Sequence, residues 1–428
     1  LVNDDCKKCK ESIGQCITTL LSRLSAQVLQ SLYEYALRWS DDATQGGQLQ
    51  RTSIQLFGLF LDARLDFMKK NKRVEILVNY LVRRIENEIS DVDHTNVLLG
   101  NEWEMVYFCL QTMEKLGLAQ QTVIWKATEL WGLVIKCLVH PHPWVRLLSS
   151  RLIQSHLSAN KPDQYERIND NLSSSIILKI PGSLFEIARN LCFQLNSDED
   201  QQVENVSTMA IKNLSWIINV MDQYPHLCFK EGKSLGFDAD DSDADDESRE
   251  MCGDRQQDPV AWLVTRLSNI AKKRGILRRE AIFKCFAAFA TVCEPSVVVR
   301  HLELMLEPLN RVLIEIKHKE ERFMGRTRNP VVSGSGPSGA DLPNEVMQLL
   351  EDKSGTEEFM GSLTAVKSKA RERKETRKQQ IAAEAIRNPE AAAKRRIDKQ
   401  KKEKQRQKRR VEEKKRGRGV FTKKPRYL

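Results

Sequence analysis

The sequence predicts an all-α protein, with an α-solenoid body followed by long basic helices at its C-terminal end. Three observations lead to this prediction. Apolar residues recur at the spacing of amphipathic helices along most of the first 320 residues. Strand and hairpin signals are nearly absent. Positive charge is concentrated in residues 367–428.

Amphipathic helices are predicted in order along the body. Their apolar residues repeat every three or four positions, which places them on one side of a helix. The predicted stretches are Ile17–Trp39, Ile54–Met68, Val74–Ile89, Trp103–Leu116, Val123–Val139, Val260–Ala271, Ile276–Val292 and Val297–Lys317.

A proline-fixed turn is predicted after the fifth of these stretches, within the sequence HPHPWVRLLSSRLI. His140 and Pro141 end the preceding helix, because proline has no amide donor and restricts the residue before it. Pro143 suits the first turn of the next helix, where a missing N–H costs nothing. Trp144 and Val145 are expected to pack in the core. The result is a pair of antiparallel helices.

The second helix of this pair resembles the second helix of a HEAT repeat, which carries Val-Arg, a small residue and then an apolar one. Val145, Arg146, Ser149 and Ile153 fit the pattern. Two further stretches fit it in part: Val206, Ala210 and Leu214, and Leu277, Ala281 and Cys285. Their separations exceed the 40–47 residues usual for this class, which indicates insertions. The predicted fold is therefore a HEAT/armadillo-like α-solenoid.

These patterns divide the chain into four predicted segments. Residues 1–322 form the helical body, with an acidic disordered insertion at about 235–257. Residues 323–344 contain VVSGSGPSGA and form a flexible linker. Residues 345–370 form a short docking segment, with an apolar stripe that includes Phe359, Leu363 and Val366. Residues 371–428 form a basic helical tail.

The charge of the chain is divided unevenly. Residues 367–428 carry 26 Lys and Arg against 8 Asp and Glu, a net charge of +18, whereas the remaining residues have a net charge of −8. One tail helix is predicted to end near Arg387 and a second to begin at Pro389. The second helix is expected to be polar on all sides, with no apolar face. Such a helix suits a groove walled by phosphate.

The candidate RNA-binding residues are the basic side chains of this second helix. They are Lys394, Arg395, Arg396, Lys399, Lys401, Lys402, Lys404, Arg406, Lys408, Arg409, Arg410, Lys414, Lys415 and Arg416. A tail that serves only as a nuclear or nucleolar targeting signal is the alternative interpretation, and the two roles are compatible.

The sequence contains no recognisable catalytic or cofactor site. Cys6, Cys9 and Cys16 offer three thiols, but no second pair of ligands follows at zinc spacing. Glu231–Ser234 lacks the first glycine of a phosphate-binding loop. The histidines of 140–156 are expected at a turn and on a helix surface. We therefore predict no enzyme activity, no cofactor, no metal and no small-molecule substrate.

The remaining features indicate an intracellular chain. The ten cysteines are scattered, and several lie in apolar helical patterns, which is typical of a reducing compartment. No leader peptide and no uncharged apolar run of about 18 residues is present, so no membrane contact is expected. The chain begins at Leu1 rather than at a methionine, as a fragment of a longer protein would.

Two stretches resemble the C-terminal end of the U-three-associated protein twenty family. They are PHPWVRLLSSRLI at 141–153 and RKQQIAAEAIRNPEAAAKRRIDKQKKEKQRQKRR at 377–410. This resemblance implies a non-enzymatic HEAT-repeat scaffold of the small-subunit processome, located in the nucleolus. It implies pre-ribosomal RNA, small nucleolar RNA and other ribosome assembly factors as partners. The alternative is a HEAT-repeat module of another nuclear pathway, such as a transport receptor or chromatin factor, with the tail as its localisation signal.

Overall fold

The computed structural model describes residues 4–41, 47–90, 102–120, 123–124, 127–159, 182–196, 203–225, 258–273, 275–324 and 341–419. Every regular element within these ranges is a helix, which confirms the all-α prediction. None of the helices searched in these ranges is long and apolar enough to cross a membrane.

Two units divide the chain, at Phe359 and Met360. The helices of the first unit are α1 (Asp4–Arg23), α2 (Ala26–Asp41), α3 (Gln48–Ala63), α4 (Leu65–Met68), α5 (Arg73–Ser90), α6 (Glu102–Ala119), α8 (Thr128–Cys137), α9 (Pro143–Ala159), α11 (Ser183–Leu195), α12 (Val203–Gln223), α14 (Pro259–Lys272), α15 (Ile276–Val292), α16 (Pro295–Met324) and α17 (Asp341–Ser354). Then come α18 (Thr356–Arg387), whose first residues belong to the first unit, and α19 (Pro389–Gly419).

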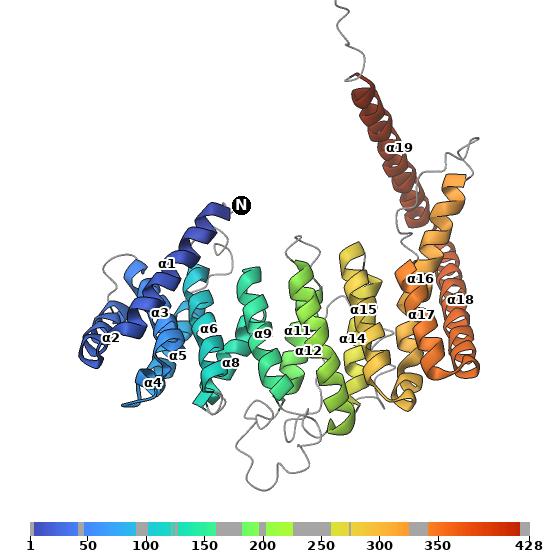
Figure 1. The fold of residues 1–428 in the computed structure, drawn as a ribbon. Helices are drawn as coiled ribbons and strands as arrows, with labels where there is room; N and C mark the ends of the chain where they lie inside the picture. The colour runs from blue at the N-terminus through green and yellow to red at the C-terminus, as the bar shows by residue number, and fades with distance from the viewer. Residues whose placement is uncertain are drawn as a thin grey trace, which may run out of the picture. The chain divides into compact units, whose positions relative to one another are not determined.

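The helices of the first unit pack in two rows, which Figure 1 shows in chain order. One row is formed by α3, α6, α9, α12, α15 and α17, each in contact with the next. The other row is formed by α5, α8, α11, α14 and α16 in the same manner. Each helix of the second row also packs on the helix of the first row that follows it in the chain. This arrangement is consistent with an α-solenoid.

The core continues from helix to helix along these rows. Five successive helices of the first row, α3, α6, α9, α12 and α15, each contribute a fully buried side chain to this core. These side chains are Phe57, Leu110, Ile153, Leu214 and Phe286. Burying a side chain of this size stabilises the folded state by roughly 1.5–3 kcal/mol. Each helix covers the apolar side of its neighbours, so the core has no break between one pair of helices and the next.

Cysteines share this core. Cys109, Cys137 and Cys285 are buried free thiols, as their positions in apolar helical patterns predict. Burial raises the pKa of the Cys109 thiol well above its ordinary value and the pKa of Cys137 to about 12. These thiols therefore stay protonated and pack as small apolar groups.

The turn before α9 explains the Val-Arg pair in the sequence. Pro143 is the first residue of α9, as predicted. The Arg146 guanidinium reaches back and donates to the carbonyl oxygens of His140 (2.8 Å) and Pro141 (2.6 Å). His140 Nδ1 in turn accepts from the backbone N–H of His142 at 3.0 Å. Polar side chains thus satisfy backbone groups that the chain reversal leaves without helical partners.

Two expectations for this region are wrong in detail. The helix predicted over Val123–Val139 is interrupted, because Ala127 has a non-helical backbone (ψ 83°) and α8 begins only at Thr128. Val145 is fully buried as expected, but Trp144 is 44% exposed. Adjacent residues of a helix point about 100° apart, so only one of the two faces the core.

Buried polar groups connect α8, α9, α11 and α12. The Gln194 amide donates to the carbonyl oxygen of Leu138 at 2.7 Å and accepts from the Ser150 hydroxyl at 3.1 Å. The Asn213 amide donates to the carbonyl oxygen of Ser150 at 2.9 Å. Ser150, Gln194 and Asn213 are all buried, so each lost bond would leave a buried polar group without water.

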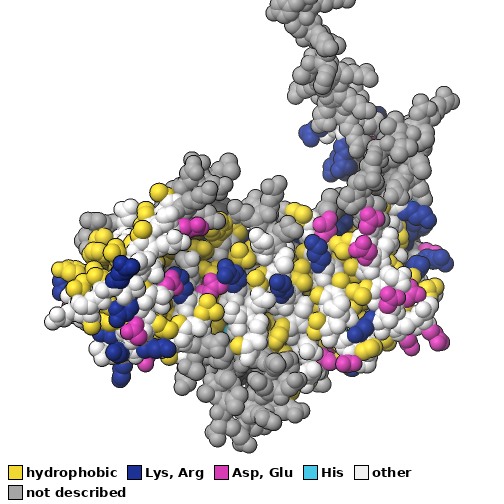
Figure 2. All heavy atoms as spheres, viewed as in Figure 1, with side chains coloured by type: hydrophobic (Ala, Val, Ile, Leu, Met, Phe, Trp, Pro, Cys, Tyr) yellow, Lys and Arg dark blue, Asp and Glu magenta, His cyan; other side chains and the backbone are white. Residues whose placement is uncertain are grey.

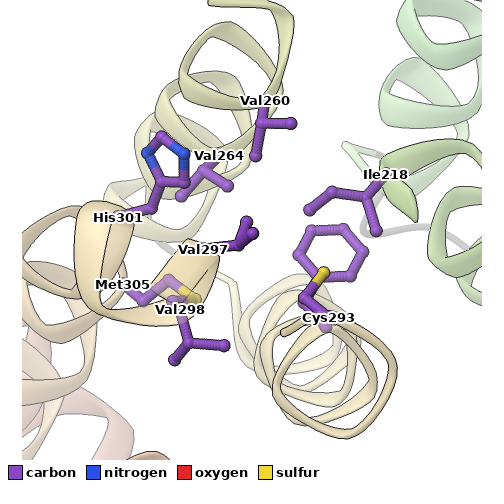
Figure 3. A pocket seen from close by; sticks show the side chains of 9 residues that line it. Ile218, Val260, Val264, Cys293, Val297, Val298, His301 and Met305 are labelled. Carbon is purple, nitrogen blue, oxygen red and sulfur yellow. The ribbon is translucent and has the colours of Figure 1, made fainter. Parts of the chain in front are cut away.

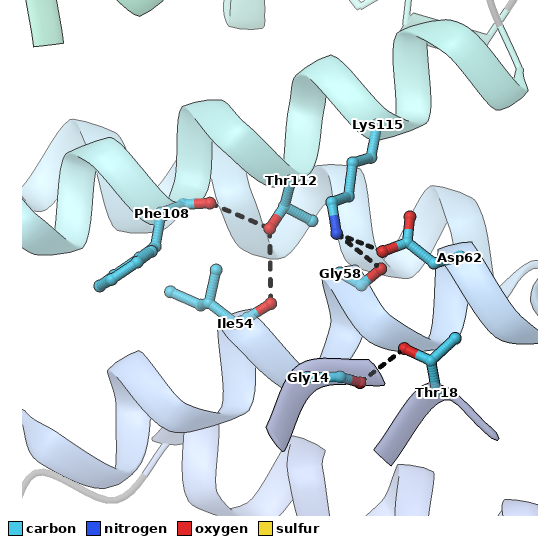
Figure 4. Close-up of polar contacts among 8 residues, drawn as sticks. All are labelled: Gly14, Thr18, Ile54, Gly58, Asp62, Phe108, Thr112 and Lys115. Atoms are coloured by element: carbon cyan, nitrogen blue, oxygen red, sulfur yellow. Dashed lines mark hydrogen bonds and ion pairs between the residues drawn. The ribbon is translucent and has the colours of Figure 1, made fainter. Parts of the chain in front are cut away.

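A second polar connection joins α3 and α6 (Figure 4). The Thr112 hydroxyl lies 2.9 Å from the carbonyl oxygen of Phe108 in its own helix and 3.4 Å from that of Ile54 in α3. One turn further along α6, the Lys115 ammonium group contacts the carbonyl oxygen of Gly58 and the Asp62 carboxylate. These contacts fix the register of α6 against α3.

The segment boundaries differ slightly from those expected. The acidic insertion at 235–257 and residues 325–340 of the predicted linker lie outside the described residues. The predicted linker 323–344 is helical at both ends, because α16 continues to Met324 and α17 begins at Asp341. Asp341 and Pro343 suit the first turn of a helix, where negative charge is favoured and a missing N–H is tolerated.

The segment predicted to dock, 345–370, begins within α17. Val346 and Leu350 of α17 are buried, and the helix packs on α15 and α16. Phe359, Leu363 and Val366 are buried as well. The apolar spacing in this part of the sequence therefore corresponds to buried side chains.

Replacing Val145 by Ala should lower the free energy of unfolding by about 2 kcal/mol, because the side chain is fully buried and its loss leaves a cavity. Trp144→Ala should also lower the free energy of unfolding, by roughly 1–3 kcal/mol, because more than half of this larger side chain is covered and its ring contacts those of Trp103 and Tyr107. Denaturant unfolding followed by circular dichroism measures both. A negligible loss for Val145→Ala would mean that this side chain is not packed in the core.

Stability should decline as the pH falls from 6.5 to 4. Burial lowers the pKa of His140 and of His156 to about 4, so the folded chain binds fewer protons than the unfolded chain in this window. The stability that the two neutral histidines contribute is fully present above pH 6.5, the ordinary histidine pKa. It is lost progressively as the pH falls below this value. His156→Gln should make the decline shallower, and the same change at exposed His318 should not. Identical pH profiles for both variants would contradict the prediction.

Candidate nucleic-acid interface

Two long helices carry the basic residues of the tail. Thr356–Arg387 forms α18, with Glu357 and Glu358 in its first turn and Arg387 in its last. This arrangement of charge complements the helix dipole. Pro389 and Glu390 open α19, so the predicted end and start of the two helices are confirmed.

The structure places all fourteen predicted RNA-binding residues in α19. Nine of them have exposed side chains: Lys394, Arg395, Arg396, Lys401, Lys402, Lys404, Arg406, Lys408 and Arg409. For the other five the structure describes the helix but not the side chain: Lys399, Arg410, Lys414, Lys415 and Arg416.

The basic side chains surround the helix rather than forming one face. Lys401, Lys402, Lys404 and Arg406 lie within two turns, and successive residues of a helix are rotated by about 100°. They therefore point in four different directions. A polyanion approaching α19 from any of these directions meets positive charge.

An ion pair spans the junction of α18 and α19. Arg395 Nη1 lies 2.7 Å from Glu384 Oε2, and this contact raises the pKa of the guanidinium. The N–H of Asn388 donates to the carbonyl oxygen of Glu384 at 2.9 Å, so the helical ladder continues up to Pro389. Arg395 thus already has an intramolecular partner, which its place in the basic run did not indicate.

Among the side chains that the structure describes in α19, the one large apolar residue is Ile397, and a single such residue does not make an apolar face. Ile397 of α19 is 52% exposed, and Ile386 at the end of α18 is 82% exposed.

The histidines lie only partly where the sequence predicts. His140 lies in the turn before α9, as expected, and is buried there, whereas His156 is buried rather than on the surface of its helix. The ring of His142 stacks on Trp103 with 3.6 Å between centroids and nearly parallel planes. These contacts are structural, and among the residues described no three His, Cys, Asp or Glu side chains form a metal-binding group. Cys9 and Cys16 are exposed free thiols.

A small apolar pocket lies between α12, α14, α15 and α16 (Figure 3). Ile218, Val264, Val297 and Met305 point into it, with His301 at its edge. Its volume of about 10 Å³ is that of a single water molecule at most, so the pocket is a packing defect and not a ligand site.

The surface of the body differs from that of the tail helices in its charge. On the face of the molecule shown in Figure 2, Lys and Arg side chains of the body are interspersed with Asp and Glu. Several are paired across helices, such as Arg51 with Glu104 at 2.7 Å and Arg279 with Glu315 at 2.9 Å. The unbalanced positive charge of this chain therefore lies in its last residues.

Comparison with known proteins gives one consistent result. Residues 49–413 match the family described as Small subunit processome component 20 homolog, C-terminal. The U3 small nucleolar RNA-associated protein 20 of Saccharomyces cerevisiae is 24% identical over 404 residues, which cover 93% of this chain and 14% of that protein. The protein of the same name from Schizosaccharomyces pombe is 24% identical over 409 residues, which cover 92% and 14%.

The match to these relatives covers more than nine tenths of this chain, but only about one seventh of the relatives' own length. The family match includes α19 up to residue 413, and therefore the junction at Pro389 and most of the basic run. The chain belongs to the family of the small subunit processome component 20 homolog, C-terminal.

Proposed function

We propose that this chain is a non-enzymatic helical scaffold in ribosome biogenesis, whose basic tail binds pre-ribosomal RNA or small nucleolar RNA. The observation that carries the proposal is the 31-residue helix α19, with exposed basic side chains in every direction and few acidic ones. The yeast relatives are named as associated with the U3 small nucleolar RNA, which is a partner of the corresponding chemistry.

The body supports the scaffold role through its two rows of helices, which we interpret as HEAT-type repeats. Glu102 and Pro143, the first residues of α6 and α9, are about 40 residues apart, as in HEAT repeats. Arg146 fixes the turn before α9, which gives the Val-Arg pair of the pattern a structural role. Such rows offer long surfaces to other assembly factors.

RNA would contact α19 mainly through its phosphates. Lys and Arg side chains around the whole helix neutralise phosphate charge, and binding gains free energy from the counterions released. Contacts of this kind position a helix but read few bases. The tail therefore supplies affinity and orientation, and we expect specificity to come from the place at which the scaffold holds it. That place is the small-subunit processome in the nucleolus.

Charge reversal in α19 tests this proposal. Seven substitutions to Glu, at Lys401, Lys402, Lys404, Arg406, Lys408, Arg409 and Arg410, should weaken binding of the full chain to structured RNA by about 100-fold at 150 mM salt. The matched control reverses seven basic residues of α18: Lys367, Lys369, Arg371, Arg373, Lys374, Arg377 and Lys378. It should weaken binding less than about 10-fold, because charges beyond the screening length of about 8 Å contribute little.

The same variants distinguish binding from targeting in cells. Fused to an independent nuclear localisation signal, the α19 variant should reach the nucleus and still lack crosslinks to pre-ribosomal RNA. Restoration of both crosslinks and growth by the signal alone would show that the tail is an address. Equal losses for the α18 and α19 variants in vitro would show that binding is not localised in α19.

A further inference from the structure

The balanced charge of the body has a local exception at the turn between α4 and α5. Lys69, Lys70 and Lys72 lie within four residues of one another, and all three side chains are exposed. No hydrogen bond or ion pair joins their ammonium groups to a residue of the described ranges. On the face shown in Figure 2, Lys and Arg side chains gather over α4, at the lower left of the molecule. We call residues 69–72 the lysine turn.

The two nearest carboxylates in the sequence do not neutralise the lysine turn. Asp66 pairs with Arg64, with 3.2 Å between its Oδ1 and the guanidinium Nε, so these two charges offset each other. Glu75 is exposed in the first turn of α5 and can offset at most one of the three lysines. An excess of positive charge therefore remains at the turn.

The backbone of the lysine turn is held in a conformation that a lysine disfavours. Asn71 and Lys72 have φ angles of 54° and 55°, in the left-handed region that glycine adopts without a steric penalty. Asparagine tolerates this region better than lysine does. Lys72 therefore costs stability, and no contact of its ammonium group within the described ranges offsets that cost. Strain of this kind is typical of functional sites.

Arg73 fixes the backbone of the lysine turn from inside the body. Its buried guanidinium donates to the carbonyl oxygens of Phe67 (2.7 Å) and Lys70 (3.3 Å) and to Gln30 Oε1 of α2 (2.6 Å). The guanidinium also lies over the Phe67 ring, 3.8 Å from its centroid. A ligand of the three lysines therefore does not have to order the backbone of the turn when it binds.

The chemistry of the lysine turn fits phosphate better than a protein surface. Ammonium groups bind phosphates as point charges, whereas lysine is depleted in protein–protein interfaces. The two apolar residues that precede the turn, Phe67 and Met68, are buried. Ile76, four residues after Lys72, is 45% exposed, but one aliphatic side chain covers too little area to anchor a protein.

We propose that the lysine turn binds phosphates of RNA, which gives the body a contact with RNA separate from that of α19. The nature of the ligand rests on the proposed function, but the residues all belong to the first unit. Two contacts with one RNA raise the affinity above that of either contact, because the second forms at a high effective concentration once the first is made. The lysine turn holds phosphates and reads few bases.

Neutralising the lysine turn by Lys69→Gln, Lys70→Gln and Lys72→Gln tests the proposal. The background is the full chain with the seven α19 reversals to Glu, in which binding through the tail is largely removed. The probe is a fluorescent RNA hairpin at about 50 mM KCl. The triple variant should weaken the remaining binding at least about 10-fold, because three fewer phosphates are neutralised and fewer counterions are released.

The matched control neutralises three exposed lysines that lie far apart in the sequence, on α8, α12 and α15. They are Lys136, Lys212 and Lys284. The net charge changes by the same amount, and binding should weaken less than about 3-fold. Both triple variants should keep the melting temperature of their background, because all six side chains are exposed.

The outcomes separate this proposal from the one for α19. Equal affinities for the lysine-turn variant and its control would overturn the lysine turn and leave the tail proposal standing. A loss caused by the lysine-turn variant, together with no loss from the α19 reversals alone, would support the lysine turn and contradict the tail proposal.

Lys72→Gly separates the charge of the lysine turn from its structure. Glycine relieves the strain at a φ of 55°, so this variant should not melt at a lower temperature than its background. It should nevertheless bind the RNA hairpin about 3-fold more weakly, because one ammonium group is lost. A lower melting temperature with unchanged RNA binding would show that Lys72 is a structural residue.

In cells, a photocrosslinking residue at position 70 of the full chain should form adducts with RNA. Adducts with an acidic segment of another protein, and none with RNA, would refute the assignment of the ligand.

Discussion

The reversal of the chain between α8 and α9 is the constraint on which the middle of the body depends. The last carbonyl groups of a helix have no partner within it, and a buried carbonyl without a partner is costly. Here Gln194 of α11 supplies the donor to Leu138, and Arg146 of α9 supplies donors to His140 and Pro141. The turn is therefore stable only when α9 and α11 are both in place.

The same polar groups extend this dependence to the next helix. Ser150 of α9 donates to Gln194, and its carbonyl oxygen accepts from Asn213 of α12. Apolar packing supplies most of the stabilisation, but it is not directional. The buried hydrogen bonds select one register of α8, α9, α11 and α12. The scaffold role that we propose for the body needs one register of these helices.

The tail follows a different physical rule. In α19 the described side chains are exposed. Long helices of this composition keep their structure through local hydrogen bonds and helix-forming residues, and their charge is unbalanced. A polyanion lowers the electrostatic cost of that charge.

The sequence predicts much of the fold because apolar spacing reports directly on which side of a helix is buried. Val145 and the helix that begins at Pro143 are examples. The same spacing cannot separate Trp144 from Val145, since both are apolar and only the direction of the side chain differs. It also cannot show the hydrogen bonds of Gln194 and Asn213, which join residues 44 to 63 positions apart.

Composition alone predicts part of the candidate interface, and the rest depends on the folded structure. The fourteen basic residues are evident from charge alone, and all lie in α19. The pairing of Arg395 with Glu384 is not evident, because it depends on how the chain passes from α18 to α19 at Asn388 and Pro389. Proline usually separates two helices, so a sequence pattern treats them independently.

The salt dependence of RNA binding tests the electrostatic role of α19 most directly. The equilibrium constant for the full chain and a structured RNA would be measured from 50 to 400 mM KCl. If about seven basic side chains of α19 neutralise phosphates, the logarithm of this constant should fall against the logarithm of the salt concentration with a slope of about −6. A slope shallower than about −1 would contradict phosphate binding by this helix.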